Sequence, residues 1–533
     1  MPPGAQSGNE TTNVLARLVI PSVADLIFIV LLVALSCGAM APRLLDDAGI
    51  GWHIRNGQQI LQTHAVTRTD PFSVSTNGKA WYAWEWLYDL SIAAIHARLG
   101  LNGIVFFTAV LIAATFALVL RVALATGGSL PVTVALLVLA ISASSIHFFA
   151  RPHVLSWLLV VIWFRILDAH EVATQKYSGI FWLPLLTLIW VNLHGGFLVG
   201  FVLLGIYLIV GAVQYFASRS PAEKQTIWQR VKRLGLVATL SLAASLANPY
   251  GYKLHVHIYQ YLSDRFLMNH IDEFLSPNFH GMPQKCFAVL LLITIAVLAG
   301  ARGKIRPSQL LVVIFAVHSG LYASRNLPVS SILLTLVIAP LASERISEAV
   351  TGQRIAPWLR KCLTGYDSFA SRMTGMETRF RGHLWPVAAI LLGLWVSTHG
   401  GWIGLRGIGS RQVMNAHFRE KRFPVQAAEV ISQSGLRQPM FAPDYWGGYL
   451  IYRLYPQTKV FVDDRHDLYG DQFVKNYLKV ILVQPEWEKV LSEDQVNWVL
   501  VPTESSLANI LKLSPRWKAI HEDKTAVLFE KQY

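Results

Sequence analysis

The stretch Leu45-Asp46-Asp47-Ala48-Gly49-Ile50-Gly51-Trp52-His53-Ile54-Arg55 follows the first long apolar run of the chain, at about residues 18–40. That run is long enough to cross a bilayer as a helix, so the two carboxylates are expected at the boundary between membrane and water. A carboxylate at this depth can act as a base on a soluble acceptor. A nearby cation can hold the phosphate of a lipid whose tail stays in the membrane.

Composition indicates a polytopic membrane protein with a soluble remainder. Of the 533 residues, 53% are hydrophobic and 15% are charged, whereas about 25% charged residues is usual in soluble proteins. The net charge of +14 lies mostly in loops between apolar runs, where positive charge sets orientation, so no nucleic-acid partner is expected. Cys37, Cys286 and Cys362 are far apart and give neither a disulfide framework nor a metal-ligand spacing.

Apolar runs predict an α-helical polytopic membrane domain of about eleven spans. Residues 84–98 are an awkward case: as a full crossing they would raise the count to twelve or thirteen, and we interpret them as a surface or partly inserted helix. The eleven predicted spans are 18–40, 102–121, 130–147, 154–168, 180–193, 197–216, 234–247, 286–301, 308–323, 327–342 and 384–399.

Basic loops set the predicted orientation. The Lys- and Arg-rich loops 217–233, 302–306 and 343–383 fall on one side of an eleven-span protein, which the positive-inside rule makes cytoplasmic. The N-terminus is then cytoplasmic, residues 1–400 form the transmembrane domain, and 41–101 form the first external loop. Residues 401–533 are expected to form an external, periplasmic α/β domain. Its candidate strands are 440–442, 459–462, 498–501 and 525–529, and its candidate helices are 424–433, 448–454 and 505–511.

In this orientation every unusual polar cluster lies on the external side. Ionisable residues near a membrane are costly and usually face a cavity or a partner, so the clusters predict one polar cavity at the outer leaflet. The clusters are Asp46-Asp47, His147–His153 with Arg151, Asn192-Leu193-His194-Gly195-Gly196, Asn248-Pro249-Tyr250-Gly251 and Ser324-Arg325-Asn326.

Several of these elements carry a family resemblance. Asp47 with Trp52-His53, then Asp70-Pro71-Phe72-Ser73, Trp84-Glu85-Trp86-Leu87, Arg151-Pro152 and Asn192-Leu193-His194-Gly195-Gly196 occur in order along the chain. Together they resemble bacterial membrane proteins of the GT-C glycosyltransferase superfamily, over about residues 18–400 as architecture. The resemblance implies a GT-C-like fold and transfer of a sugar from a polyprenyl-phosphate donor on the external face of the membrane. It also implies a catalytic carboxylate in the first external loop, namely Asp47, with Asp46 as its neighbour.

Residue chemistry extends this candidate site. Glu85 is a third candidate catalytic carboxylate. Arg suits bidentate binding of a phosphate, and His can donate a single hydrogen bond to it. The candidate donor-phosphate ligands are Arg55, His53, Arg151, His153, His194 and Arg325, and the candidate acceptor or sugar ligands are Asp70, Trp81, Trp84 and Asn326. No cofactor is assigned, and a divalent cation held by Asp46 and Asp47 with Glu85 or Asp70 stays open.

The sequence thus predicts an inverting hexosyl- or pentosyltransferase of the bacterial cytoplasmic membrane. Its partners would be a polyprenyl-phosphate-linked sugar, membrane lipid, and a glycan, lipid or protein acceptor. Two rivals remain: a transporter or flippase of a lipid-linked glycan, and a non-catalytic membrane scaffold. Single residues also have plainer interpretations, because Arg151 can mark a span end, His194 a helix-packing site, and the tryptophans ordinary interfacial anchors.

Overall fold

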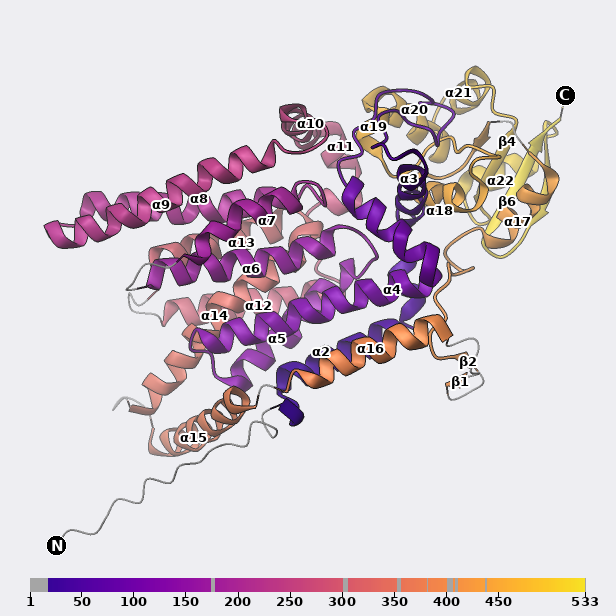
Figure 1. The fold of residues 1–533 in the computed structure, drawn as a ribbon. Helices are drawn as coiled ribbons and strands as arrows, with labels where there is room; N and C mark the ends of the chain where they lie inside the picture. Colours follow the sequence, from indigo (N-terminus) through magenta and orange to yellow (C-terminus); the bar gives the residue numbers. More distant parts are fainter. Residues whose placement is uncertain are drawn as a thin grey trace, which may run out of the picture.

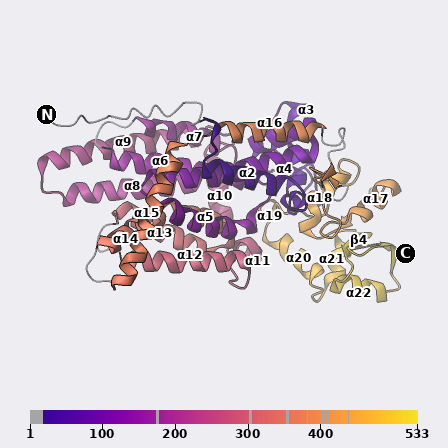
Figure 2. The same cartoon turned by 90° about the horizontal axis from the view of Figure 1, so that it is seen from below.

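The computed structural model describes residues 18–173, 178–300, 305–351, 356–380, 382–399, 406–407, 411–436 and 439–532. A long helical bundle makes up one part, and a smaller α/β part is attached at one end of it (Figures 1 and 2). The expected mostly helical architecture with a C-terminal α/β region is confirmed.

The bundle is built from the described residues between 18 and 399. Its α-helices are α2 (Val23–Ser36), α3 (Ile50–Thr63), α4 (Trp86–Ala125), α5 (Leu130–Ser144), α6 (His153–Val172), α7 (Trp182–Trp190), α8 (Phe197–Ala217), α9 (Pro221–Ser245), α10 (Tyr252–Ser263), α11 (Arg265–His270), α12 (Met282–Ala299), α13 (Pro307–Tyr322), α14 (Leu327–Thr351), α15 (Pro357–Arg379) and α16 (Leu384–His399). Its short 3₁₀ turns are η1 (Ala41–Leu45), η2 (Ser145–His147), η3 (Gly179–Phe181), η4 (Asp272–Phe274) and η5 (Ser324–Asn326).

Each of the eleven predicted spans coincides with a helix, but fewer helices are long and apolar enough to cross a membrane on their own. Six helical segments in the described residues meet that requirement, or seven if the bent pair α15 and α16 counts as one. The count of eleven is therefore not reproduced, because α2, α7, α13 and α16 have only 14, 9, 16 and 16 residues, and α9 does not meet the hydropathy and charge requirement. The six segments are Trp86–Ala125, Leu130–His147, His153–Val172, Phe197–Ala217, Met282–Ala299 and Ser324–Val350.

Residues 84–98 are not a separate surface helix. From Trp86 they form the first part of α4, which runs on to Ala125 and breaks its helical geometry only at Gly100, with φ 60° and ψ −155°. Gly tolerates this left-handed φ because it has no Cβ. One kinked helix therefore joins the first loop to the bundle, and α2, α3, α5, α6, α14 and α16 pack against it.

The C-terminal part contains a four-stranded sheet in the order β3-β4-β6-β5. Strands β3 (Met440–Phe441) and β4 (Trp498–Pro502) are parallel, while β6 (Ala526–Lys531) pairs antiparallel with β4 and with β5 (Trp517–Glu522). Strands β3, β4 and β6 confirm three of the four predicted strands, and β5 was not predicted because its side chains are mostly exposed and lack an apolar alternation. The helices of this part are α17 (Val425–Ser434), α18 (Asp444–Leu454), α19 (His466–Tyr469), α20 (Asp471–Ile481), α21 (Trp487–Glu493) and α22 (Ser506–Leu513), and a two-residue ladder, β1 (Arg406–Gly407) with β2 (Arg411–Gln412), precedes them.

The predicted strand at 459–462 is instead a junction. Val460 makes isolated bridges to Ser73 of the first loop and to Met440 of β3, so the first loop joins the edge of the C-terminal sheet. Helix α3 of the same loop also packs against α18. A Cβ on Gly51 would stand 2.0 Å from the carbonyl oxygen of Gly448, so the two helices touch at a pair of glycines.

The Lys- and Arg-rich segments lie at the end of the bundle opposite the C-terminal part (Figure 1). Figures 1 and 2 show α15 and the connection between α8 and α9 at the end of the bundle away from the C-terminal part. The C-terminal part, α3 and the first loop gather at the opposite end. The chain therefore has one strongly basic end and one end that carries the first loop.

Candidate active site

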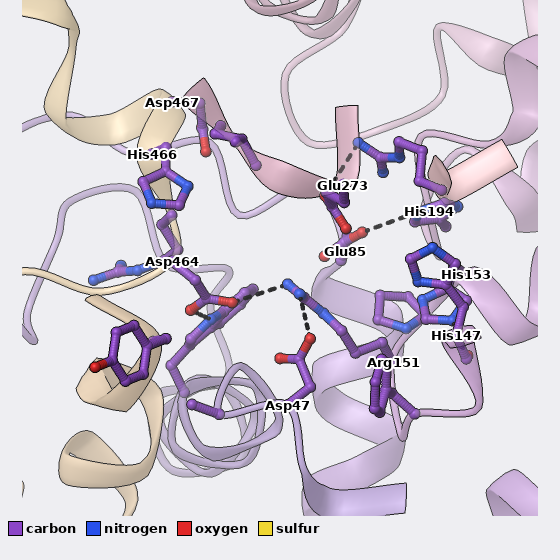
Figure 3. A pocket seen from close by; sticks show the side chains of 18 of the residues that line it. Asp47, Glu85, His147, Arg151, His153, His194, Glu273, Asp464, His466 and Asp467 are labelled. Atoms are coloured by element: carbon purple, nitrogen blue, oxygen red, sulfur yellow. Dashed lines mark hydrogen bonds and ion pairs between the residues drawn. The ribbon is translucent and has the colours of Figure 1, made fainter. Parts of the chain in front are cut away.

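A cavity of about 450 Å³ lies where the first loop, the bundle and the C-terminal part meet. Its walls come from the η1–α3 connection, the start of α4, the α5–α6 and α7–α8 connections, η4, η5 and the α18 and α19 region (Figure 3). The ionisable residues lining it are Asp46, Asp47, Glu85, Asp89, His147, Arg151, His153, His194, Tyr261, Asp272, Glu273, Arg325, Arg422, Tyr445, Asp464, Arg465, His466 and Asp467.

Arg151 bridges two carboxylates from distant parts of the chain. Its Nη1 donates to Asp47 Oδ2 over 2.9 Å, and its Nη2 donates to Asp464 Oδ2 over 3.0 Å (Figure 3). Burial lowers the pKa of Arg151, but the two carboxylates outweigh it and hold that pKa above its usual value. The pKa of Asp464 is raised to about 6 by burial, which the charge of Arg151 only partly offsets. The bridge therefore holds two carboxylates against one cation.

Gly49 makes this arrangement sterically feasible. Its backbone N–H donates to Asp47 Oδ1 over 2.9 Å. A Cβ at this position would stand 2.6 Å from Asp464 Oδ2 and 3.1 Å from Arg151 Nη2. Trp52 completes the arrangement by donating from Nε1 to Asp464 Oδ1 over 2.9 Å. Both oxygens of each carboxylate thus accept a hydrogen bond.

Asp46 differs from its neighbour. Its carboxylate pairs with the guanidinium of Arg419, and its backbone oxygen accepts a bond from Arg422 Nε over 3.4 Å. Both arginines belong to the segment that leads into α17. Asp46 therefore ties the first loop to the C-terminal part, while Asp47 faces Arg151.

Glu85 lies between two imidazoles, just before α4. Its Oε2 is 3.8 Å from His53 Nε2, and its Oε1 is 3.7 Å from His194 Nε2. Burial raises the pKa of Glu85 to about 7, although Arg151 opposes that shift. A carboxyl with this pKa can exchange a proton near neutral pH.

The ring orientation of His194 is set by a chain of hydrogen bonds. Trp190 Nε1 donates to Ser156 Oγ over 2.7 Å, and Ser156 Oγ lies 2.8 Å from His194 Nδ1. The Gly196 N–H also donates to that nitrogen over 3.0 Å. Burial and the nearby Arg325 lower the pKa of His194 to about 3, so the ring is neutral and carries its proton on Nε2.

A second cation lines the far wall. Arg325 Nη1 lies 3.4 Å from Glu273 Oε1, and its guanidinium stands over the ring of Phe274. Burial raises the pKa of Glu273, but the nearby arginines, chiefly Arg325, lower it by more. The resulting pKa is about 2. Arg151 and Arg325 thus each face a carboxylate in the cavity.

Comparisons with known proteins agree with this architecture. No protein-family model matches the sequence, and no curated protein matches it significantly. Among solved structures, the apo oligosaccharyltransferase of Archaeoglobus fulgidus matches over 90% of this chain and 69% of its own, at 11% identity and a TM-score of 0.50. The chain has a GT-C fold.

Two further structures are similar to the GT-C fold of this chain at lower scores. Apo ArnT from Cupriavidus metallidurans matches over 95% of this chain and 96% of its own, at 13% identity and a TM-score of 0.46. The oligosaccharyltransferase AglB of Archaeoglobus fulgidus, in complex with an inhibitory peptide and a dolichol-phosphate, covers 90% of this chain and 69% of its own, at 10% identity and 0.49.

The GT-C fold brings most of the residues predicted for the site to one cavity. Four of the five predicted polar clusters contribute to its lining, and the fifth, at 248–251, packs beside the first loop through Tyr250, which accepts a bond from the Ala83 N–H. The predicted site residues that line the cavity are Asp46, Asp47, Glu85, Arg151, His153, His194, Arg325, Trp81 and Trp84.

Four predicted site residues do not line it. His53 is fully buried behind Glu85, and Arg55 donates through Nε and Nη2 to the carbonyl of Tyr452 in α18. Asp70 is buried in an ion pair with Arg465, and Asn326 donates to the carbonyl of Ser319. Arg55 and Asp70 therefore hold the first loop to the C-terminal part, and their roles as phosphate and sugar ligands stay predictions.

Sequence reasoning did not assign several groups that line this cavity. Asp464 follows the apolar stretch 459–462, and only the fold shows that it faces Arg151. Glu273 is in a loop without a recognisable pattern, and its pairing with Arg325 is a tertiary contact. The other unassigned lining groups include Asp89, His147, Asp272, Arg422, Arg465, His466 and Asp467.

A divalent cation does not fit the residues as they are arranged. In the part of the chain that the structure describes, no group of three or more His, Cys, Asp or Glu side chains is placed to hold a metal ion. The Arg151 guanidinium stands between Asp47 and Asp464, and Asp46 and Asp70 are each paired with an arginine.

Proposed function

We propose that this protein is an integral membrane glycosyltransferase that moves a sugar from a polyprenyl-phosphate donor to an acceptor at the external face of a bacterial cytoplasmic membrane. The observation that carries the proposal is the cavity in which Arg151 joins Asp47 and Asp464 beside Glu85, at one end of apolar helices. The GT-C fold supports it, since the neighbour with a TM-score of 0.50 is an oligosaccharyltransferase.

The position of the cavity supports the external sidedness. The basic segments around α15 and between α8 and α9 lie at the opposite end of the bundle (Figure 1). By the positive-inside rule that end is cytoplasmic, and the cavity is then external. A lipid tail can stay among the apolar helices while its phosphate reaches the cavity.

The cations of the cavity suit the donor phosphate. Arg151 has five N–H donors, of which Asp47 and Asp464 take two, so three remain for phosphate oxygens. Arg325 supplies a second guanidinium. As the bond from the sugar to the phosphate breaks, the phosphate gains negative charge, and these donors stabilise it.

A carboxylate of the first loop serves as general base in this proposal. The candidates are Asp47, which the family resemblance implies, and Glu85, whose pKa of about 7 is matched to neutral pH. Attack of the acceptor from the face opposite the phosphate gives inversion at the anomeric carbon. The acceptor is a glycan, lipid or protein, and Trp81, Trp84 and Tyr82 supply aromatic surface for a sugar ring.

Purified protein in detergent tests the proposal. It is incubated with radiolabelled polyprenyl-phosphate hexoses or pentoses and extracted cell-envelope acceptors, and transferred and released sugar are measured. We expect transfer by the wild type and a loss of at least about 100-fold in Asp47→Asn/Glu85→Gln, because general-base catalysis contributes about 10²–10⁴-fold. Movement of an intact lipid-linked glycan across proteoliposomes without sugar release would instead support a flippase.

A further inference from the structure

The two imidazoles beside Glu85 present different nitrogens to it. His194 accepts hydrogen bonds at Nδ1 from the Gly196 N–H and lies 2.8 Å from the Ser156 hydroxyl at the same atom. The Nε2 that faces Glu85 therefore carries the proton and acts as a donor. Figure 3 shows this ring directed at Glu85.

His53 has the opposite arrangement. Its Nδ1 is 2.5 Å from Asp89 Oδ1, and Asp89 Oδ2 accepts a bond from Asn56 Nδ2 over 2.6 Å. When Asp89 is ionised, the proton of His53 lies on the Nδ1 that faces this carboxylate, and Nε2 is left with a lone pair. Within the described chain that Nε2 is a buried atom without a hydrogen-bond partner, and Glu85 stands 3.8 Å from it. Buried polar atoms are rarely left unpaired, so this nitrogen is available to accept a hydrogen bond.

Glu85 accepts a hydrogen bond from the Trp84 side chain, and its contacts with the two imidazoles are longer. Asp47 already accepts from Arg151 at one oxygen and from the Gly49 N–H at the other. The two imidazole nitrogens stand beyond hydrogen-bond length from Glu85 and would come into range with a small shift. The further charged groups that act on Glu85 are Arg151, Arg325 and Asp467.

We propose that Glu85 is the general base of the transfer, with His194 holding its ionised form and His53, oriented by Asp89, holding its protonated form. This inference rests on the proposed function and assigns its base. The two histidines are positioning residues, and Asp47 serves to hold Arg151 in place for the phosphate.

The chemical step balances without a further reagent. The acceptor oxygen forms a bond to the anomeric carbon, and its hydroxyl proton passes to a Glu85 oxygen. The bond from the anomeric carbon to the phosphate oxygen breaks, and its electron pair leaves with the lipid phosphate. Protonated Glu85 then donates a hydrogen bond to His53 Nε2 until the proton is lost to solvent.

The pH dependence of kcat/KM for sugar release from a polyprenyl-phosphate sugar tests the assignment. Activity requires ionised Glu85, so it should fall as the pH drops below about 7, the pKa of that carboxyl. Glu85→Ala should lose about 100-fold or more, and added formate should restore part of the loss by supplying a carboxylate. The exposed Glu429→Gln in α17, whose carboxylate pairs with Arg453, is the matched control and should keep the wild-type profile.

The histidine variants give the sharper readout. His53→Leu removes the hydrogen-bond acceptor for protonated Glu85, so the fall of kcat/KM at acid pH should move to lower pH. His194→Leu removes the hydrogen-bond donor for ionised Glu85, so this fall of kcat/KM should move to higher pH. A purely structural role for both residues predicts lower activity without these opposite displacements.

The outcomes separate this inference from the proposed function. If the wild type transfers sugar but Glu85→Ala is as active, or formate rescues Asp47→Ala and not Glu85→Ala, then Glu85 is not the base and the proposed function stands. If the wild type releases and transfers no sugar from any polyprenyl-phosphate donor, the proposed function fails and this inference fails with it. Unchanged melting temperatures of the variants show that each compares folded protein.

Discussion

Arg151 and Asp464, 313 residues apart in the chain, are joined by a 3.0 Å hydrogen bond. The same guanidinium holds Asp47 at 2.9 Å, so the bundle, the first loop and the C-terminal part all meet at one side chain. The C-terminal part is thereby a component of the site, because it supplies one of the two carboxylates that fix the cation.

Replacing Arg151 by lysine should lower sugar transfer by about 10–100-fold. A single ammonium group cannot span both carboxylates and leave donors for a phosphate, as the planar guanidinium does. The measurement is kcat/KM for sugar release. Arg453→Lys, at an exposed pair with Glu429, is the control, and equal activity of the two variants would contradict the bridging role.

Gly49→Ala should disturb the same bridge without changing any charge. The added methyl would stand 2.6 Å from Asp464 Oδ2, so that carboxylate or the loop must move. We expect a drop in activity of about tenfold or more and a lower melting temperature. Gly205→Ala in α8, whose added methyl meets no atom within 4 Å, should match the wild type in both measurements.

Gly448→Ala should loosen the contact between the first loop and the C-terminal part. Its methyl would stand 2.2 Å from the carbonyl oxygen of Ala48, which forces α18 away from α3. Limited proteolysis should then cut faster in the segment between α16 and α17. Gly235→Ala in α9, which meets nothing within 4 Å, is the control, and an unchanged cleavage rate in Gly448→Ala would argue against this contact as the anchor.

His466→Gln should reduce stability in a pH-dependent way. Burial lowers the pKa of His466, but its 2.7 Å contact with Asp444 more than offsets this and holds the pKa above 6.5. The pair therefore stabilises the fold fully below pH 6.5, and the contribution is lost as the pH rises through the higher folded-state pKa.

Melting temperatures at pH 6 and pH 9 check this prediction. The variant should melt about 2–4 °C below the wild type at pH 6, and the gap should narrow by pH 9. Asp444→Asn should show the same trend, since it removes the other half of the pair. A gap that is constant with pH would mean that the charge on His466 does not contribute.

Much of the fold follows from local sequence. Every predicted span coincides with a helix, because a run of apolar residues long enough for a bilayer favours a helix by its own backbone bonding. Strands β3, β4 and β6 were also predicted from short apolar runs. The number of helices that can cross a membrane alone was overestimated, since several predicted runs form helices that are too short, such as α7 with 9 residues.

The site was only partly predictable. Asp47, Glu85, Arg151, His194 and Arg325 were identified as unusual polar groups beside apolar runs, and the fold brings them into one cavity. The sequence does not separate them from Arg55 and Asp70, which look equally suitable. Arg55 instead donates to the carbonyl of Tyr452, and Asp70 pairs with the guanidinium of Arg465. Both contacts depend on how the C-terminal part packs against the first loop.

The chain's own sequence determines which segments are apolar helices and which polar groups stand at their ends, because both follow from residues adjacent along the chain. Tertiary structure alone decides which carboxylate faces which cation. Asp464 reaches Arg151, and Glu273 reaches Arg325, only because α3, α18 and the loops η4 and η5 pack around one cavity. Charge pairing in a buried site depends on distances of a few ångströms, and no local pattern specifies these distances between remote residues.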